Sequence, residues 1–348
     1  MRNWIAAVAC AAALIGALGQ SRARAQEEKV LNLYIWSEYL PPSVLDKFTQ
    51  RTGVKVKVDN YDSNETLLEK LQSGAAGYDL CVPTDYMIRI LIREKLIQSI
   101  DAGKVTNLKN IGKHFLGRPF DPENKYCVPY LWGTSGIGYN KKAVTASVDG
   151  WSIMFDAKYR GKILMLNDMR ECFAAALKSM GKSLNTKDEA TLKQAAEKLK
   201  AQKKLVKTYD SDNYDGILKA GDVVLVQGYN GQMAKLGMEN PDKFAYVIPK
   251  EGCTQSMDGM CIPAKAKHVR NAHLFLNFIH EPEINAEIVN GVSYASTNEA
   301  AKKFIKPEIL NNPSIYPPEE ALKNCEFMED LGEATELMDK LWTEIKSQ

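Results

Sequence analysis

The sequence has few of the residues that enzyme and metal sites most often use. Its 348 residues include only four histidines, and none of them has a carboxylate or cysteine pattern beside it. The chain also has no G-x-S-x-G, H-E-x-x-H or P-loop motif, and Gly136-Ile137-Gly138 lacks the third glycine of a dinucleotide-binding fingerprint. We therefore expect no catalytic residues, no cofactor and no metal site, and an exported enzyme stays only as an alternative. The histidines are expected at the surface or in packing: His114, His268, His273 and His280.

Cysteines are also sparse, and their spacing does not suit a metal. They are far apart, mostly beside apolar residues, and no C-x-x-C pair occurs. Buried free thiols are the first expectation. One or two disulfides are the alternative in an exported chain, because compartments outside the cytoplasm are oxidising, and the spacing favours no particular pairing. Six cysteines follow residue 25: Cys81, Cys127, Cys172, Cys253, Cys261 and Cys325.

Long apolar runs are absent after the first 20 residues. The run from Trp4 to Leu18 follows the positive charge of Arg2 and precedes Ala23-Arg24-Ala25, which has the form of a cleavage site. Because ~20 apolar residues are needed to span a membrane, this run is too short. We expect residues 1–25 to be an export signal that places the protein in the periplasm. Lipid attachment at Cys10, which follows three small or apolar residues, is the alternative.

The chain also lacks an excess of charge of either sign. It has 45 basic and 43 acidic residues, and removal of the three arginines among residues 1–25 leaves 42 basic residues and a net charge of −1. This balance gives no electrostatic reason to expect nucleic acid as a partner. The 323 residues that remain are enough for two domains, at ~100–200 residues each.

Strand and helix patterns alternate from Val30 onward. In the first part we expect strands at 30–35, 54–60 and 78–82 and helices at 41–52, 63–73 and 86–95. Pro41 and Gly53 mark the limits of the first helix, and Asp62 with Glu65 is expected to form a capping box on the second. Strands joined by helices lie parallel in a sheet covered on both faces. The pattern resumes with strands at 162–166, 223–227, 244–248 and 259–263 and helices at 171–180, 188–202 and 271–279.

This alternation predicts an α/β protein with two lobes. The stretch 129–136, rich in glycine and aromatic residues, is expected to cross between them. We assign residues 26–134 and 259–305 to the first lobe and 135–258 and 306–348 to the second. Two lobes joined by more than one crossing leave a cleft that can close by hinge motion. Ligands bind at the carboxyl ends of the strands in such sheets, so the strand ends are the candidate site.

Acidic and aromatic residues occur together at these strand ends. Carboxylates accept charge-assisted hydrogen bonds, and aromatic faces attract cations and cover methylene groups, so such a cleft suits a cation with methylene spacers. Structural roles stay open for several of them: Asp168 and Glu171 fit a capping box, Trp36 fits a core position, and Glu38 fits an exposed loop. The groups are Trp36 with Glu38 and Tyr39, Asp85 with Tyr86, Asp168 with Glu171, and Asp258 near Ser256.

Five segments occur in an order that resembles the spermidine/putrescine-binding proteins of bacterial ABC importers. The similarity extends from about Leu31 to about Leu341. It implies a type II periplasmic-binding fold that closes on putrescine, spermidine or both and delivers the ligand to an inner-membrane ABC permease, with a monomer as the simplest state. Binding of another cationic solute or an amino acid is the alternative. The segments are Trp36–Pro42, Tyr61–Thr66, Tyr78–Thr84, Phe120–Pro122 and Pro129–Gly138.

The resemblance also assigns ligand contacts to individual positions. Ser256 stands where spermidine binders tend to have tryptophan, and Met328 stands where they have a glutamine that contacts an amine. Loss of that partner favours putrescine, whereas the retained acids Asp168 and Glu171 favour a site for a third amine, so the sequence does not rank the two polyamines. The matching positions are Trp36, Ser37, Glu38, Tyr39, Thr84, Tyr86, Asp168, Glu171, Ser211, Tyr229, Asp258 and Tyr294.

Overall fold

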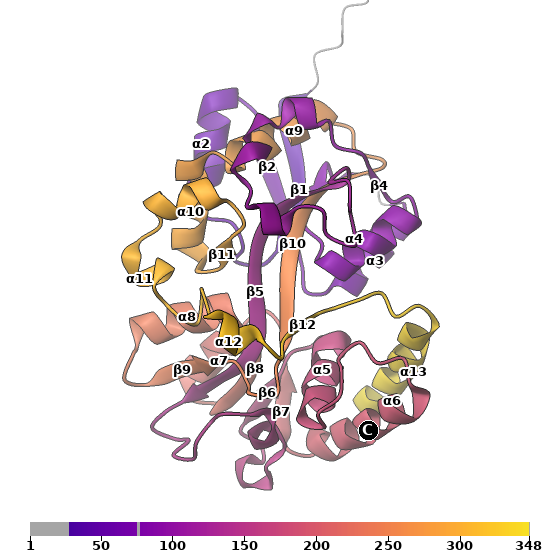
Figure 1. Ribbon diagram of the computed structural model, residues 1–348, viewed down its shortest axis with the longest axis vertical. Helices are drawn as coiled ribbons and strands as arrows, with labels where there is room; N and C mark the ends of the chain where they lie inside the picture. Colours follow the sequence, from indigo (N-terminus) through magenta and orange to yellow (C-terminus); the bar gives the residue numbers. More distant parts are fainter. Residues whose placement is uncertain (1–27, 75–76, 348) are drawn as a thin grey trace, which may run out of the picture.

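Alternating strands and helices build two α/β lobes, one above the other in Figure 1. The computed structural model describes residues 28–74 and 77–347. In the first lobe, β1 pairs in parallel with both β2 and β3, as the alternation predicted. Its elements begin with β1 (Val30–Trp36), α2 (Pro42–Thr52), β2 (Lys55–Tyr61), α3 (Asn64–Gln72), β3 (Leu80–Cys81), α4 (Asp85–Arg93) and β4 (Ile97–Gln98).

The helix limits of this lobe follow from local chemistry. Pro42 occupies the first turn of α2, where its missing N–H is not needed, and Gly53 ends the helix in the left-handed region with a φ of 70°. Helix α3 differs from the prediction. Ser63, not Asp62, is its N-cap, because the Ser63 hydroxyl accepts a hydrogen bond from the backbone N–H of Thr66 at 3.1 Å.

The second lobe has a parallel core of β6 between β7 and β8. Helix α5 begins at an aspartate N-cap, Asp168, and α6 packs beside it together with α13. The elements are β6 (Ile163–Met165), α5 (Met169–Ser179), α6 (Glu189–Lys203), β7 (Val206–Tyr209), α7 (Tyr214–Ala220), β8 (Leu225–Tyr229), α8 (Asn230–Glu239), β9 (Phe244–Val247) and α13 (Glu333–Ser347).

Two long strands, β5 (Cys127–Asn140) and β10 (Thr254–Pro263), pass between the lobes and pair with each other in antiparallel register (Figure 1). Strand β10 pairs with β3 in the first lobe, and β5 pairs with β8 and β9 in the second. The crossing expected at 129–136 therefore lies within β5. Strand β10 is longer than the predicted 259–263, and this extension brings Ser256 and Asp258 into the strand that joins the lobes.

The rest of the chain covers the first lobe and returns to the second. No helix in the described ranges is long and apolar enough to cross a membrane. The remaining elements are α9 (Val269–Ile279), α10 (Pro282–Val292), β11 (Ala295–Ser296), α11 (Pro307–Leu310), α12 (Glu319–Leu322) and β12 (Glu326–Phe327), with short 3₁₀ turns at Ala102–Lys104, Thr106–Asn110, Lys113–Phe115, Trp151–Phe155, Ala157–Tyr159 and Glu299–Phe304.

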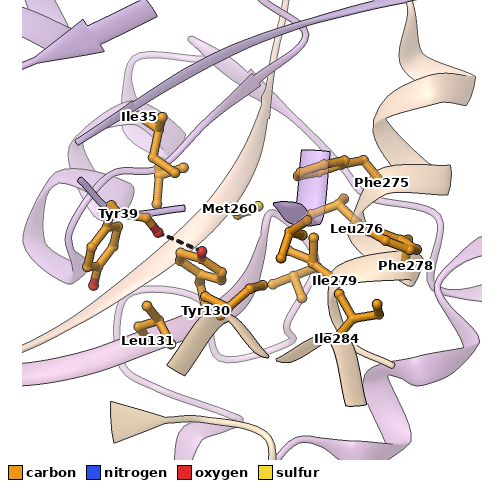
Figure 2. Packing of buried hydrophobic residues seen from close by; sticks show 14 of the residues in the cluster. Ile35, Tyr39, Tyr130, Leu131, Met260, Phe275, Leu276, Phe278, Ile279 and Ile284 are labelled. Atoms are coloured by element: carbon orange, nitrogen blue, oxygen red, sulfur yellow. Dashed lines mark hydrogen bonds between the residues drawn. The ribbon is translucent and has the colours of Figure 1, made fainter. Parts of the chain in front are cut away.

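Each lobe has its own hydrophobic core. Figure 2 shows part of the first, where Phe275 and Ile279 of α9 belong to the same buried cluster as Ile35 of β1. The Tyr130 hydroxyl donates a 2.9 Å hydrogen bond to the Tyr39 carbonyl. Burial of each large apolar side chain contributes about 1.5–3 kcal/mol. This core also contains Ile309, so its packing extends past residue 305, where the sequence placed the lobe boundary. The exact division into lobes stays a prediction.

Candidate functional site

A cavity lies between the lobes, where the strands of both sheets end. It is lined from the first lobe by the residues after β1, β2 and β3 and from the second by those after β6 and β8. The strand ends that the sequence marked as the candidate site therefore meet at this cavity. The structure brings these predicted residues to the lining: Trp36, Ser37, Tyr39, Thr84, Tyr86, Asp168, Glu171, Ser211, Tyr229, Ser256, Asp258, Tyr294 and Met328.

Asp258 is a buried carboxylate at the joint between the lobes. Its two oxygens accept hydrogen bonds from the Tyr39 hydroxyl at 2.6 Å and from the Thr84 hydroxyl at 2.8 Å. Asn64 orients Thr84 in turn, because its side-chain amide donates to the Thr84 hydroxyl at 3.1 Å and its carbonyl accepts from the Thr84 N–H. Burial raises the pKa of Asp258 to about 6, and the two hydroxyl bonds oppose that rise. The result is a fixed acceptor for a cation.

Asp168 and Glu171 form a second acidic group at the start of α5. Asp168 caps the helix by accepting a hydrogen bond from the Glu171 N–H at 3.0 Å, so the capping interpretation is confirmed for Asp168, and the same residue also lines the cavity. The Glu171 side chain accepts from the Thr254 hydroxyl at 3.1 Å. Burial, and then the charge of Asp168, raise the pKa of Glu171 to about 8. Two adjacent buried carboxylates thus favour a cation between or beside them.

Glu65, which the sequence assigned only to a capping box, does not line the cavity but interacts with Asp168 through its charge. Glu65 of α3 accepts a hydrogen bond from the Tyr86 hydroxyl at 3.1 Å. Burial, and next the charge of Asp168, raise the pKa of Glu65 to about 7. The charge of Arg170 opposes the rise in the pKa of both Glu65 and Glu171. Its guanidinium lies 5.0 Å from the Tyr86 ring centre and donates to the Glu329 carbonyl. The acids of the two lobes therefore influence one another through space.

Aromatic rings form much of the remaining wall. Tyr39 meets Tyr294 edge to face with 4.9 Å between ring centres, and Trp36 lies 4.4 Å from Tyr61. Such rings can cover methylene groups and contact cations at their faces. The Ser211 hydroxyl is buried without a hydrogen-bond partner among the described residues, which leaves an acceptor open in the lining.

Two predicted residues do not line the cavity. Glu38 is exposed, in a turn after β1 with a φ of 53°, which fits the alternative of an exposed loop acid. Asp85 is buried, and its carboxylate accepts from the N–H of Tyr86 at 2.7 Å and from that of Met257 at 3.2 Å. It thereby fixes the start of α4 to β10. Its backbone partners occupy the oxygens that a ligand would need.

Several lining residues were not predicted individually. Asp62, Asn64 and Thr134 lie in segments that the motif patterns had marked, and Asp212 directly follows the predicted Ser211, so those signals could have found them. Asn230 gave no such signal. Its side chain accepts from the Thr134 N–H at 3.1 Å and donates to the Ser314 carbonyl at 2.8 Å, contacts that depend on distant parts of the chain. The others are Gly133, Gln232 and Thr254.

No group of three or more histidine, cysteine, aspartate or glutamate side chains within residues 28–74 and 77–347 is arranged to hold a metal ion. A cleft between two lobes, lined by buried acids and aromatic rings, is instead suited to a small organic cation. A model of bacterial extracellular solute-binding proteins matches residues 43–317. The chain belongs to this family. The arrangement of this solute-binding protein, with its site between two lobes, agrees with that membership.

Curated relatives are similar over the whole length of the chain. The spermidine/putrescine-binding periplasmic protein of Escherichia coli is 37% identical over 349 residues, which cover 100% of this solute-binding protein and 99% of that relative. The putrescine-binding periplasmic protein SpuD of Pseudomonas aeruginosa is also 37% identical, with 93% and 94% covered. These names describe what the relatives bind.

Solved structures show the same fold. The TpPotD lipoprotein of Treponema pallidum superposes on this solute-binding protein with a TM-score of 0.82 at 34% identity, covering 91% of this chain and 99% of that one. The substrate-binding protein PotD of a spermidine/putrescine ABC transporter from Streptococcus pneumoniae gives a TM-score of 0.76 at 31% identity, with 91% and 98% covered. The two-lobed periplasmic-binding-protein fold predicted from the sequence is confirmed.

Proposed function

We propose that this solute-binding protein captures a polyamine, putrescine, spermidine or both, outside the cytoplasm and delivers it to an ABC permease. The observation that carries the proposal is the set of buried carboxylates, Asp168, Glu171 and Asp258, in one cavity walled by aromatic rings. The names of the relatives from Escherichia coli and Pseudomonas aeruginosa point to the same ligands. A polyamine has ammonium groups separated by methylene groups. Acids at separate places in the cavity can each pair with one ammonium group, and the aromatic rings can cover the methylene groups between them.

The energetics of the site favour a cation. In the absence of a ligand, the buried carboxylates lack a full counter-charge, and burial raises the pKa of both Glu171 and Asp258. An ammonium group restores that charge through hydrogen bonds worth about 1.5–3 kcal/mol each. Contacts with aromatic faces add about 0.5–2 kcal/mol each. A few such contacts reach the roughly −8 kcal/mol of a micromolar complex after the costs of binding.

Residues from both lobes must contact the ligand at once. Tyr39 and Thr84 belong to the first lobe and Glu171 to the second, while Asp258 lies on the strand that joins them. A ligand that contacts both lobes binds more tightly when the cleft is closed, so it shifts the population toward the closed form. The closed form is the shape that we propose the permease binds. A monomer is sufficient for this role, and the role needs no catalytic residue or cofactor.

Export is part of the same proposal. The sequence of residues 1–25 favours a cleavable signal, and Cys10 offers a lipid anchor as the alternative; both lie outside the described residues. The curated relatives are named as periplasmic proteins, and the Treponema pallidum relative is named a lipoprotein. These names support a location outside the cytoplasm and leave both routes open.

The experiment that tests the function is isothermal titration of the mature protein, freed of copurified ligand, with putrescine, spermidine and a neutral amino acid. Micromolar or tighter binding of a polyamine, without binding of the amino acid, is the expected result. The order of the two polyamines then shows how the serine at 256 and the methionine at 328 set ligand length, because both line the cavity. Heat from the amino acid alone, or from none of the three, would overturn the proposal.

A further inference from the structure

Two cysteines lie side by side where two paired strands begin. Cys253 directly precedes β10 and Cys325 directly precedes β12, and Thr254 pairs with Glu326 in parallel register. The Glu326 N–H donates to the Cys253 carbonyl at 3.0 Å, and the two Sγ atoms are 3.4 Å apart. Paired strands are ~4.8 Å apart, within the Cα separation of ~4.4–6.8 Å that disulfides have. Only a small side-chain movement separates the two sulfurs from bonding distance.

We propose that Cys253 and Cys325 form a disulfide bond in the exported protein and that this bond ties β12 covalently to β10. The inference rests on the export proposed above, because disulfides form and persist in oxidising compartments. It does not rest on the identity of the ligand. It also replaces, for this pair, the expectation from sequence that all six cysteines are buried free thiols.

The surroundings of the pair fit a stepwise oxidation. Cys325 is half-buried, whereas Cys253 is fully buried, so Cys325 is the thiol that an oxidant reaches first. The hydrogen bond between the two sulfurs lowers the pKa of Cys325 to about 7. Because the thiolate is the nucleophile in exchange, a large fraction of Cys325 is reactive near neutral pH.

The oxidant is a disulfide-bearing molecule, either a small disulfide or a dithiol oxidoreductase. The Cys325 thiolate attacks one sulfur of the oxidant, a mixed disulfide forms, and the other sulfur of the oxidant leaves and takes up the proton that Cys325 lost. Cys253 then loses its proton and attacks the Cys325 sulfur, and the second sulfur of the oxidant leaves as a thiol. Two protein thiols become one disulfide, and the disulfide of the oxidant becomes two thiols.

The bond would act on a segment that reaches both the cavity and the other lobe. After β12 the chain continues to Met328, which lines the cavity, and to Asp330, which forms an ion pair with Arg93 of α4. Glu326 within β12 is paired with Lys178 of α5. A covalent link at the start of β12 would therefore restrain the cavity wall at Met328 and the ion pair between Asp330 and Arg93.

A second group of cysteines provides an internal comparison. Cys261 of β10 lies in register with Cys81 of β3 on one side and with Cys127 of β5 on the other. All three are buried in the first lobe, so an oxidant in solution does not reach them in the folded protein. We expect them to stay free thiols, together with Cys172, which is buried in the second lobe.

Peptide mapping tests the inference on the full exported protein. Free thiols are alkylated under denaturing conditions without reduction, both directly after purification and after equilibration with oxidised glutathione, and the digest is analysed by mass spectrometry. We expect one cross-linked peptide that joins Cys253 to Cys325, with the other four alkylated. Alkylation of Cys253 and Cys325 after equilibration with oxidised glutathione, or linkage of either to another cysteine, would overturn the inference. Polyamine titration of the same sample reports on ligand binding separately.

Variants make the assignment specific. The C253S and C325S proteins should each lose the cross-linked peptide and leave the remaining partner open to alkylation. The C172S protein is the matched control, because Cys172 is a buried thiol with no cysteine beside it in the described structure, and it should keep the cross-link. The wild-type map needs no variant to fold, so the inference stays falsifiable if a serine variant aggregates.

Discussion

At the scale of single residues, the site depends on carboxylates that the fold holds out of water without a full complement of cations. Asp258 is the clearest case, since two hydroxyl groups hold it and it is only 9% exposed. Such a group is costly to bury and is stabilised when an ammonium ion arrives. The burial of these acids therefore supports the proposal that they bind a cation, because they add little to the stability of the free protein.

Replacement of Asp258 by alanine should weaken polyamine binding by about 3 kcal/mol or more, because the ammonium group would be buried without its partner. Isothermal titration of D258A against wild type measures the loss. The matched control is E38Q, which removes an exposed acid that does not line the cavity. Undiminished affinity in D258A, or an equal loss in E38Q, would contradict the assignment of Asp258 to the ligand.

Binding should also depend on pH, with a sign that follows from the raised pKa values. In the free protein the pKa of Glu171 is about 8 and that of Asp258 about 6, each raised by burial. Both groups must lose a proton to receive an ammonium ion, so the affinity should rise as the pH increases from about 6 to 8, and binding should release protons. Titration in buffers of different ionisation enthalpy counts those protons. A constant affinity over this range, without proton release, would show that these acids do not bind the cation.

The sequence predicted the residues of the site well where local order determines their position. Trp36 ends β1, and Thr84 and Asp168 follow β3 and β6, strands whose ends could be located from the alternation of strand and helix. Asp85 was misplaced because its partner, the N–H of Met257, lies 172 residues away, and nothing in the local pattern reports that bond. Asn230 was missed for the same reason, since its role depends on contacts with β5 and with Ser314.

At the scale of elements, local propensity determined most helices, and tertiary contacts determined the strands between the lobes. The start and end of α2 were predicted from Pro41 and Gly53. Strand β10 was predicted too short because its first residues, Thr254 to Asp258, show no alternating apolar pattern. They are held instead by pairing of Gln255 to Met257 with β5 and of Thr254 with β12. The part of β10 that was not predicted contains Asp258.

The cap of α3 gives a prediction at this scale. The S63A substitution removes the acceptor for the Thr66 N–H, so it should lower the free energy of unfolding by about 1 kcal/mol. Denaturant unfolding followed by circular dichroism measures the loss. D62A is the comparison, because Asp62 accepts only from the Thr66 hydroxyl at the same turn, and its effect on stability should be smaller. An equal or larger loss of stability in D62A would show that Asp62, and not Ser63, is the N-cap of α3.

The proposed disulfide has its effect on stability at this scale as well. It would close a loop between residues 72 apart, and the chain-entropy account assigns about 4 kcal/mol to a loop of that length. Addition of a reductant should therefore lower the unfolding temperature of the wild-type protein and leave that of a C253S/C325S double variant unchanged. Calorimetric scans with and without dithiothreitol measure the unfolding temperatures. An equal decrease in both proteins would show that the reductant does not act on a bond between Cys253 and Cys325.

At the scale of the whole molecule, the two lobes are joined by the paired strands β5 and β10, with the segment before β12 as a further crossing. Paired strands resist stretching but allow twisting, so this joint permits rotation of one lobe against the other. We expect a polyamine to decrease the radius of gyration measured by small-angle X-ray scattering. D258A should need a higher ligand concentration for the same decrease. A radius that is unchanged at saturation would show that binding does not close the cleft.

The position of β10 within the sheet also governs when the protein can fold during its synthesis. This strand lies between β3 and β5 in the strand order, yet Cys261 is 180 residues beyond its partner Cys81. The sheet of the first lobe therefore stays incomplete until about three quarters of the chain has left the ribosome, and contacts so distant in sequence form slowly. Slow completion suits the export proposed above, because a chain that crosses a membrane through a narrow channel must still be unfolded. The strand that joins the two lobes thus also makes completion of the first lobe wait for residues far along the chain.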